Sequence, residues 1–224
     1  PIMLNIGVVP PNPGYLDAIR QITRKHGVML IFDEVKTGAT VAAGGAVEKY
    51  GVVPDLVALA KATGGGTPIG AVLGTEEIMA QISEGTVAQI GTFNGNPLTM
   101  AAAEATLTQV LDENAYKRLD EIGARILDGC QDVCNRYGLP AYAVGVASKG
   151  CVMFAEEPVV DYRSYTQHFN EQLNYLGWLY HMVNGVYMTP GADEQWTLSV
   201  LHTDNEIDHY VEVFEEFAKD VTAG

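Results

Sequence analysis

The sequence lacks any run of about eighteen apolar residues, the length that a membrane-spanning helix needs. No charged-then-apolar leader opens the chain, so we expect neither secretion nor a membrane anchor. Basic residues are scarce: 13 Lys and Arg stand against 28 Asp and Glu, which gives a formal net charge of -15. Because nucleic acids and anionic membranes bind basic patches, this balance argues against both as partners.

Cysteine is also rare, and the three cysteines cannot all pair with one another. Cys130 and Cys134 lie four residues apart in an expected helix, which is typical of core packing. Neither they nor Cys151 combine with the five histidines at zinc-site spacing, so we assign no metal. A reduced, cytoplasmic setting is the simplest interpretation.

Apolar residues make up 47% of the chain, enough for a hydrophobic core. Residues 16–27 carry apolar side chains at helical spacing and end at Gly27, which is typical of a helix C-terminus. The run that follows, residues 28–35, is apolar on both faces, as a buried parallel strand is. The same helix-then-strand unit recurs over residues 46–60. The pattern therefore predicts an α/β fold with a mostly parallel sheet.

From about residue 115 onward, strands and helices no longer alternate regularly, which indicates a smaller α+β domain. A capping box at Thr203 and Glu206 predicts the start of a last helix. The other elements expected in the second half of the chain are helices over residues 96–113, 116–137 and 164–183, a strand-like stretch over 142–156, and short strands near Val186 and Thr197.

Lys61 is the most informative residue. It ends the apolar run of residues 55–60 and precedes the turn of residues 64–66, which are all glycine. The run leaves no polar face for a surface strand, and glycine lets the backbone approach a ligand closely. A lysine in this setting suits Schiff-base chemistry, in which its amine bonds to an aldehyde carbon.

Asp33 lies at the end of the neighbouring apolar run. An acid at such a place is at least as often a cap of the next turn. The functional interpretation is that its carboxylate holds a pyridine nitrogen protonated, through a charge-assisted hydrogen bond of roughly 1.5–3 kcal/mol. Val35 lies on the same side of the strand and would pack against the ring. Because ligands bind at the carboxyl ends of such strands, the acid and Lys61 together predict pyridoxal phosphate (PLP).

The loop that contains Gly91 and Thr92 is a third candidate, because it precedes a helix. Helix N-termini with nearby hydroxyl groups bind phosphate well. Asn96 and Pro97 also fit an ordinary helix start, as the cap and the first helical residue. The two interpretations are compatible.

In order along the chain, these segments resemble the class III aminotransferases of PLP fold type I. The nearest branch contains glutamate-1-semialdehyde aminomutase and β-amino-acid transaminases. The resemblance covers nearly the whole chain and rests on residues 5–10, 30–35, 54–61, 64–71, 91–97 and 202–203. It implies that residues 1–114 are the C-terminal half of the PLP-binding large domain and that residues 115–224 are the small C-terminal domain.

The resemblance also implies a role for individual residues. Lys61 matches the Schiff-base lysine, Asp33 the partner of the pyridinium nitrogen, and Val35 the residue under the ring. Thr92, which follows Gly91, matches a threonine that reaches the cofactor phosphate of the neighbouring subunit. These five residues form the expected cofactor site.

Glu194 aligns more loosely with a glutamate near the substrate in the aminomutase branch. Lys36 departs from the family pattern, because transaminases often carry glutamine there, near the ring hydroxyl; we expect the change to affect substrate choice.

The family's N-terminal half supplies the phosphate cup, an aromatic ring over the cofactor and usually an arginine for the substrate carboxylate. This chain has no counterpart of that half. We therefore expect a complementary N-terminal half, on a separate chain or in a missing segment, and a homodimer-type assembly.

The leading hypothesis is an aminotransferase or aminomutase that uses PLP and acts on a small amino acid or amine. Lys61 would bind the cofactor covalently and carry the proton during amino transfer. Two alternatives stay open. The chain would either be a non-catalytic half-subunit that serves as a structural or assembly partner, or belong to a PLP racemase or decarboxylase.

Overall fold

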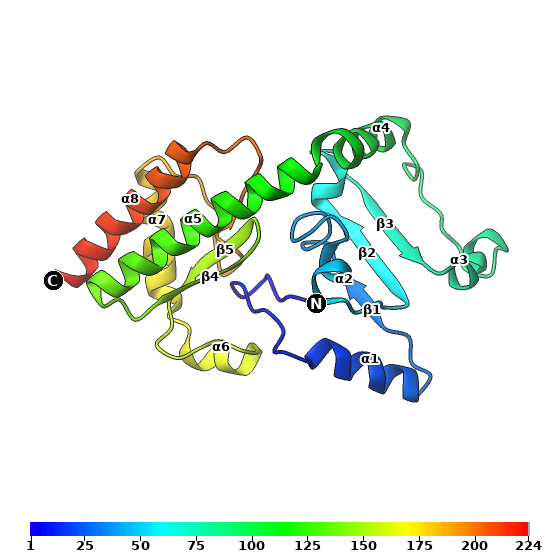
Figure 1. Ribbon diagram of the computed structural model, residues 1–224, viewed down its shortest axis with the longest axis horizontal. Coiled ribbons are helices and arrows are strands. Elements are labelled where there is room, and N and C mark those ends of the chain that lie inside the picture. The colour runs from blue at the N-terminus through cyan, green and yellow to red at the C-terminus, as the bar shows by residue number, and fades with distance from the viewer. Residues whose placement is uncertain (224) are drawn as a thin grey trace. The chain divides into compact units, whose positions relative to one another are not determined.

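The computed structural model describes residues 1–223, which divide into two units (Figure 1). The first unit comprises Pro1 and Asn12–Tyr116, and the second comprises Ile2–Pro11 and the chain from Lys117 onward. The expected boundary between residues 114 and 115 lies close to this division. Residues 2–11, which we expected in the first part of the protein, instead pack with the second unit.

The physical reason is that residues 2–11 are apolar and have their hydrogen-bonding partners in the second unit. Leu4 and Val8 are among their buried side chains. The Gly7 N–H donates to the carbonyl of Ala192, and the Glu194 N–H donates to the carbonyl of Leu4 at 3.3 Å. This segment therefore completes the core of a unit whose other residues come more than a hundred positions later.

The first unit is mixed α/β, as expected, and contains one three-stranded sheet in the order β1-β2-β3. Strands β1 and β2 are parallel, whereas β3 runs antiparallel to β2. Only residues 61–69 connect β2 to β3, too few for the crossover that a parallel neighbour requires. The elements are α1 (Tyr15–Lys25), β1 (Ile31–Asp33), α2 (Gly45–Tyr50), β2 (Leu56–Ala60), the 3₁₀ helix η1 (Lys61–Gly64), β3 (Gly70–Gly74), α3 (Glu76–Ser83), α4 (Pro97–Ala105) and the π-helix η2 (Thr106–Val110).

An ion pair between Arg20 and Asp55 connects α1 to the segment that precedes β2. The Arg20 guanidinium donates to both carboxylate oxygens of Asp55, at 2.7 and 2.8 Å. The Leu30 N–H donates to the same carboxylate at 2.7 Å. A small core of Leu16, Phe32 and Val52 packs in the same unit.

We expect the Asp55 contacts to make the first unit sensitive to acid. The Arg20 hydrogen bonds, followed by that of Leu30, lower the pKa of Asp55 from 3.8 to about 2. Because the pKa is lower in the folded state, the stabilisation is present above the ordinary value and is lost as the pH falls through the folded value. Asp55→Asn should therefore flatten the decline of the denaturant midpoint between pH 3.8 and about 2. Asp17→Asn, an exposed acid of α1, should leave that decline unchanged; equal slopes in the two variants would contradict the prediction.

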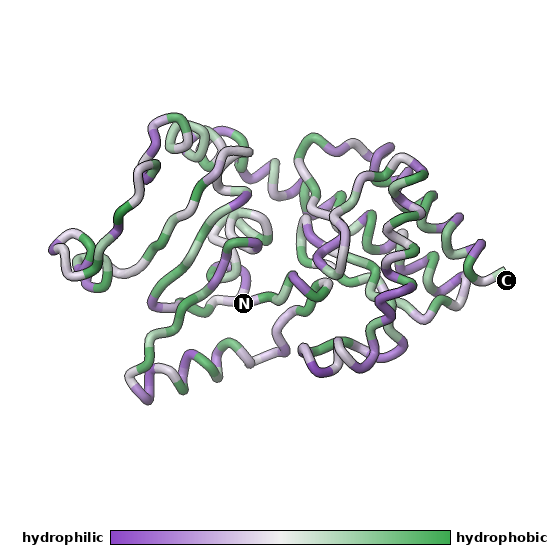
Figure 2. Tube along the Cα trace, turned by 180° about the vertical axis from the view of Figure 1, so that it is seen from behind, coloured by the Kyte–Doolittle hydropathy of each residue, from purple (hydrophilic) through white to green (hydrophobic). Residues whose placement is uncertain are grey.

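The second unit contains an antiparallel sheet in the order β4-β5-β6, covered by long helices. Its elements are α5 (Glu113–Tyr137), which begins within the first unit, β4 (Tyr142–Val146), β5 (Lys149–Met153), α6 (Tyr162–His168), α7 (Glu171–Val183), β6 (Trp196–Thr197) and α8 (Asp204–Thr222). Figure 2 shows apolar and polar residues interleaved along these helices, as expected for helices with one buried face.

The core of the second unit includes one face of α5. Its buried side chains include Leu119, Ile122, Ile126, Cys130 and Val133, which are spaced at helical intervals. All three cysteines of the chain are buried and free. Burial raises the pKa of Cys134 to about 11 and that of Cys151 to about 12, so both stay protonated at neutral pH.

Three expectations about elements are corrected. The single helix expected over residues 164–183 is two helices, because the chain is extended at Phe169 and Asn170 and the Asn170 side chain caps α7. The helix expected over residues 96–113 turns into the π-helix η2 and stops at Leu111. No strand forms at Val186.

The capping box of Thr203 and Glu206 is confirmed at the start of α8. Among the described residues, no helix combines the length and hydrophobicity that crossing a membrane requires.

Candidate active site

Asp33 and Lys61 follow neighbouring parallel strands. Asp33 is the last residue of β1 and lies opposite Ala58 of β2, and Lys61 comes directly after the end of β2. At about 3.3 Å per residue, the Cα of Lys61 lies roughly 10 Å farther along the strand direction than that of Ala58. Both residues are exposed at the carboxyl ends of their strands. The fold therefore presents an acid and an amine at the same edge of one sheet.

The backbone of Lys61 has a conformation that residues with a side chain rarely adopt. Its φ is 52°, in the left-handed region. A non-glycine residue there costs on the order of 1–3 kcal/mol and persists only where its surroundings enforce it. The Thr63 hydroxyl donates to the carbonyl of Ala60 at 2.9 Å, which closes the turn around Lys61. The position of Lys61 is thus set by the fold.

Two of the three glycines after Lys61, Gly65 and Gly66, have different structural roles. A Cβ on Gly65 would lie 2.1 Å from the hydroxyl oxygen of Thr106, so Gly65 allows close packing against the end of α4. Gly66, in contrast, has nothing within 4 Å of the place where a Cβ would stand. The sequence-based idea that these glycines leave room for a ligand therefore applies to Gly66, whereas Gly65 serves internal packing.

The Asp33 carboxylate accepts a hydrogen bond from the Val35 N–H at 3.0 Å. The turn-capping interpretation of Asp33 is therefore confirmed, and the exposed carboxylate retains acceptor positions for a ligand. Val35 is half-buried on the same segment. Their roles toward a cofactor stay predictions.

Glu34 is a structural residue of the site that sequence analysis did not single out. Its side chain is 1% exposed, and its carboxylate accepts hydrogen bonds from the Thr37 hydroxyl at 2.9 Å and from the N–H groups of Ala46 and Val47 at 2.6 and 3.3 Å. A Cβ on Gly45 would lie 2.4 Å from this carboxylate. Glu34 thus fixes both the segment after Asp33 and the start of α2. The available signal was that adjacent strand residues point to opposite faces, so one of two consecutive acids must point inward.

Removal of the Glu34 carboxylate should destabilise the protein strongly. Glu34→Ala leaves the Thr37 hydroxyl and two backbone N–H groups without their acceptor, and each buried unsatisfied group costs about 1–3 kcal/mol. We expect the free energy of unfolding to fall by about 3 kcal/mol or more, and by less in Glu34→Gln, which keeps one acceptor oxygen. The exposed Glu48, which accepts from the Gly44 N–H at 2.6 Å, is the matched control, and Glu48→Ala should cost about 1 kcal/mol. Equal losses for Glu34→Ala and Glu48→Ala in denaturant unfolding would refute this assignment.

Gly91 and Thr92 lie in the loop between α3 and α4, and Thr92 is exposed. The Asn94 N–H donates to the carbonyl of Gly91 at 3.0 Å, which forms a tight turn. Asn96 caps α4: its side-chain oxygen accepts from the second and third residues of the helix, and Pro97 is the first helical residue. The capping interpretation is confirmed, and a phosphate-binding role for Thr92 stays a prediction.

Glu194 belongs to the second unit, where its side chain is buried. Its carboxylate accepts a hydrogen bond from the Lys149 amine at 3.1 Å, and that amine lies 3.2 Å from the Thr197 hydroxyl. The Lys149 and Glu194 side chains are only 5% and 8% exposed. The sequence signal that could have revealed this pair is Lys149 itself, a lysine at the start of an otherwise apolar strand. A substrate-binding role for Glu194 stays a prediction.

Known proteins resemble this chain in sequence and in fold. A family model described as aminotransferase class-III matches residues 1–188. Glutamate-1-semialdehyde 2,1-aminomutase 2 of Brevibacillus brevis is 43% identical over 95% of this chain, which spans 49% of that protein. Two solved structures at 30% identity have similar folds: an omega-transaminase from Sphaerobacter thermophilus, with a TM-score of 0.87, and a beta-phenylalanine aminotransferase from Variovorax paradoxus, with a TM-score of 0.88. They match 98% and 97% of this chain and 50% of their own. The chain thus spans about half the length of these relatives.

Proposed function

The chain belongs to the class-III aminotransferases, and we propose that it is the lysine-bearing half of a PLP-dependent aminotransferase or aminomutase. The observation that carries the proposal is the placement of Asp33 and Lys61 at the carboxyl ends of β1 and β2, with Lys61 held at a φ of 52°. Ligands of open α/β sheets bind at this edge. The two side chains also match the chemistry of the cofactor, which needs an acid at its ring nitrogen and an amine at its aldehyde.

When bound, PLP supplies an electron sink that stabilises negative charge on the substrate carbon next to the amino group. The Lys61 amine would hold the cofactor through its aldehyde carbon and, once displaced by the substrate amine, would carry a proton to and from that substrate carbon. The Asp33 carboxylate would keep a proton on the ring nitrogen. Val35 would pack against the ring, and the Thr92 hydroxyl, beside Gly91, would donate to the cofactor phosphate of the neighbouring subunit.

Because the chain spans 49% of the Brevibacillus brevis aminomutase, we infer a complementary N-terminal half. We infer a homodimer-type assembly because Thr92 would complete a phosphate site across a subunit interface. The first unit would be the C-terminal half of a large PLP-binding domain, and the second would be a small C-terminal domain of fold type I. The substrate would be a small amino acid or amine. The 43% identity favours the aminomutase branch, and Glu194 and Lys36 are the residues of this chain that we expect to affect substrate choice.

Cofactor labelling tests the proposal. Supplied with PLP and its complementary half, the protein should gain a visible absorbance band that borohydride removes, and the cofactor mass should then be found on the peptide that contains Lys61. The loaded protein should transfer an amino group to a keto acid or an aldehyde, or should move it within glutamate-1-semialdehyde. A protein that binds no PLP would refute the enzyme and leave the structural half-subunit. PLP binding without amino transfer to any acceptor would leave racemisation or decarboxylation.

A further inference from the structure

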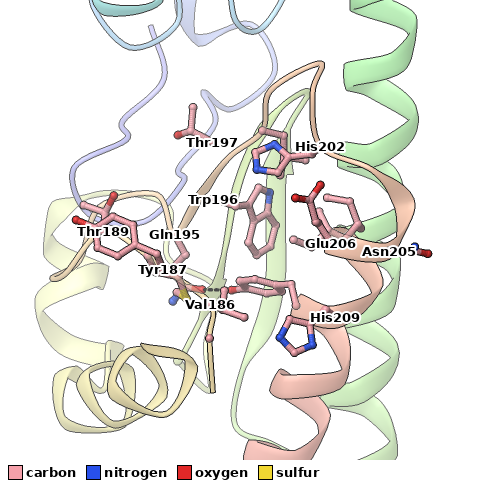
Figure 3. Close-up of a pocket in the computed structure, with 16 residues that line it drawn as sticks. Val186, Tyr187, Thr189, Gln195, Trp196, Thr197, His202, Asn205, Glu206 and His209 are labelled. Atoms are coloured by element: carbon pink, nitrogen blue, oxygen red, sulfur yellow. Dashed lines mark hydrogen bonds between the residues drawn. The ribbon is translucent and has the colours of Figure 1, made fainter. Parts of the chain in front are cut away.

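A cavity of about 650 Å³ lies within the second unit (Figure 3). Residues 185–189, strand β6 and the first turns of α8 form its walls, and Ile126 of α5 contributes to them. Its volume is within the range of about 300–1,000 Å³ that is typical of small-molecule sites. None of the residues to which we assign the cofactor lines it, so the cavity is unexplained by the proposed activity.

The apolar wall of the cavity is aromatic and held in place. The rings of Trp196 and Tyr210 lie 5.5 Å apart in an edge-to-face arrangement, and both residues are buried. The Tyr210 hydroxyl donates to the side-chain oxygen of Gln195 at 3.3 Å. A Cβ on Gly150 would lie 2.3 Å from the indole of Trp196, so the ring packs directly against strand β5. This surface is rigid, so the protein would lose little conformational freedom when a ligand with an apolar body binds to it.

Glu206 is the one carboxylate among the residues that line the cavity, and no lysine or arginine lines it. Both hydrogen bonds that Glu206 accepts from described residues go to Oε2, from the N–H and the hydroxyl of Thr203 at 2.7 and 3.1 Å. These bonds lower the pKa of Glu206, backbone bond first, so its carboxylate is ionised at neutral pH. Oε1 is left without a hydrogen-bond donor among the described residues. Glu206 is exposed, and it brings a negative charge to a lining that has no lysine or arginine among the described residues.

Two histidines of the lining, His202 and His209, form hydrogen bonds with backbone groups through their rings. The Ser199 N–H donates to Nδ1 of His202 at 2.8 Å, so the neutral ring carries its proton on Nε2. Nε2 of His209 lies 3.3 Å from the carbonyl of Asn184, so that nitrogen is the hydrogen-bond donor. Figure 3 shows the His202 ring and the Glu206 carboxylate near the indole of Trp196.

We propose that this cavity binds a small organic ammonium compound with an apolar body. Glu206 would be its counter-ion, and Trp196 and Tyr210 would contact the apolar part, with the cation near their rings as in other cation–π sites. Carboxylates and phosphates are disfavoured because, among the described residues, no lysine or arginine lines the cavity. The proposal does not depend on PLP binding or on Lys61.

Benzyltrimethylammonium is a suitable probe, because it has no N–H and cannot condense with an aldehyde cofactor. The complete protein, with its complementary half, would be labelled with 5-fluorotryptophan and titrated while ¹⁹F NMR is recorded. Trp196 and Trp178 are the two tryptophans of this chain, and Trp178 does not line the cavity. We expect a saturable shift of the Trp196 signal, assigned by Trp196→Phe, and a much smaller shift for Trp178.

Glu206→Gln should weaken probe binding by up to about fivefold, because the probe loses its counter-ion and exposed ion pairs contribute modestly. Glutamine keeps an acceptor oxygen for Thr203, and an unchanged melting temperature would verify that α8 is intact. Glu212→Gln makes the same charge change on the same helix, outside the cavity, and should leave binding unaltered. Added salt should weaken binding of the probe to the unsubstituted protein as well, which tests the charge without a variant.

Neopentylbenzene, the uncharged isostere of the probe, should bind more weakly than the probe does. Equal binding of the two compounds would overturn the proposal, and so would equal losses in Glu206→Gln and Glu212→Gln. Absence of a saturable Trp196 shift would also overturn it, whether the cavity binds nothing or the complementary half fills it. PLP uptake, measured in the same samples, reports separately on the proposed function.

Discussion

Lys61→Ala should abolish amino transfer, with a loss of about 10⁴-fold or more. The amine would act as both the covalent ligand of the cofactor and the proton carrier, and general acid–base catalysis alone contributes on the order of 10²–10⁴-fold. The substitution should leave the fold intact, because alanine meets the same backbone restriction as lysine at a φ of 52°. Activity would be measured as amino transfer by the assembled, PLP-loaded protein.

Two further variants separate the chemistry of Lys61 from its charge and from general effects. Lys61→Arg keeps a positive charge but removes the nucleophilic amine, so it should be as inactive as the alanine variant. Lys49→Ala removes an exposed lysine of α2 in the same unit and should retain full activity. If Lys61→Ala kept more than about a tenth of the activity, covalent and proton-transfer roles for Lys61 would be excluded.

Gly123→Ala should destabilise the second unit by about 3 kcal/mol or more. Helix propensity alone predicts the opposite, because alanine is favoured over glycine within a helix by about 1 kcal/mol. However, a Cβ at residue 123 of α5 would lie 2.1 Å from the carbonyl oxygen of Ala147, which is backbone and has little freedom to move. Ala147 is itself held at a φ of 52° in the turn between β4 and β5. Overpacking against backbone therefore outweighs the gain in propensity.

Gly177→Ala in α7 is the matched control. There the nearest atoms to the new Cβ are ring carbons of Phe154 at 3.4 Å, which is ordinary van der Waals contact. Without a clash, the propensity term should prevail, and the variant should be as stable as the parent or more stable by up to about 1 kcal/mol. Thermal and denaturant unfolding of the two variants would decide the matter. Similar stabilities for Gly123→Ala and Gly177→Ala would show that the close approach of α5 to the turn is not significant.

Much of the cofactor edge is predictable from the sequence because it depends on local patterns. The apolar runs that end at Asp33 and Lys61 specify two neighbouring strands, and parallel strands bring such ends to one edge of a sheet. The expected burial on both faces is wrong for this chain, because β1 is buried only at Phe32 and β2 is only half-buried. The triple-glycine turn and the Asn96–Pro97 helix start are equally local signals. In each case the residues that determine the feature are within a few positions of it.

What the sequence does not reveal depends on long-range contacts. Glu34 looks like part of a charged pair until the fold brings the start of α2 onto its carboxylate. Lys149 and Glu194 are 45 residues apart, and their pairing depends on the register of β5 and β6. Likewise, the break between α6 and α7 lies at Phe169 and Asn170, where no proline or glycine marks it; the Asn170 N–H instead donates to the carbonyl of Phe154 at 2.8 Å.

The affiliation of residues 2–11 with the second unit bears on how the protein forms during translation. These residues leave the ribosome before the rest of the second unit, yet their buried partners, such as Cys151 and Met153 beside Gly7, are synthesised more than 140 positions later. Closing so long a loop is costly in entropy and slows folding. The second unit therefore cannot mature while the chain is nascent at residue 116, and a polypeptide that started at Lys117 would lack part of its own core. We expect chaperones that shield apolar segments to bind residues Ile2–Pro11 of the nascent chain throughout that interval.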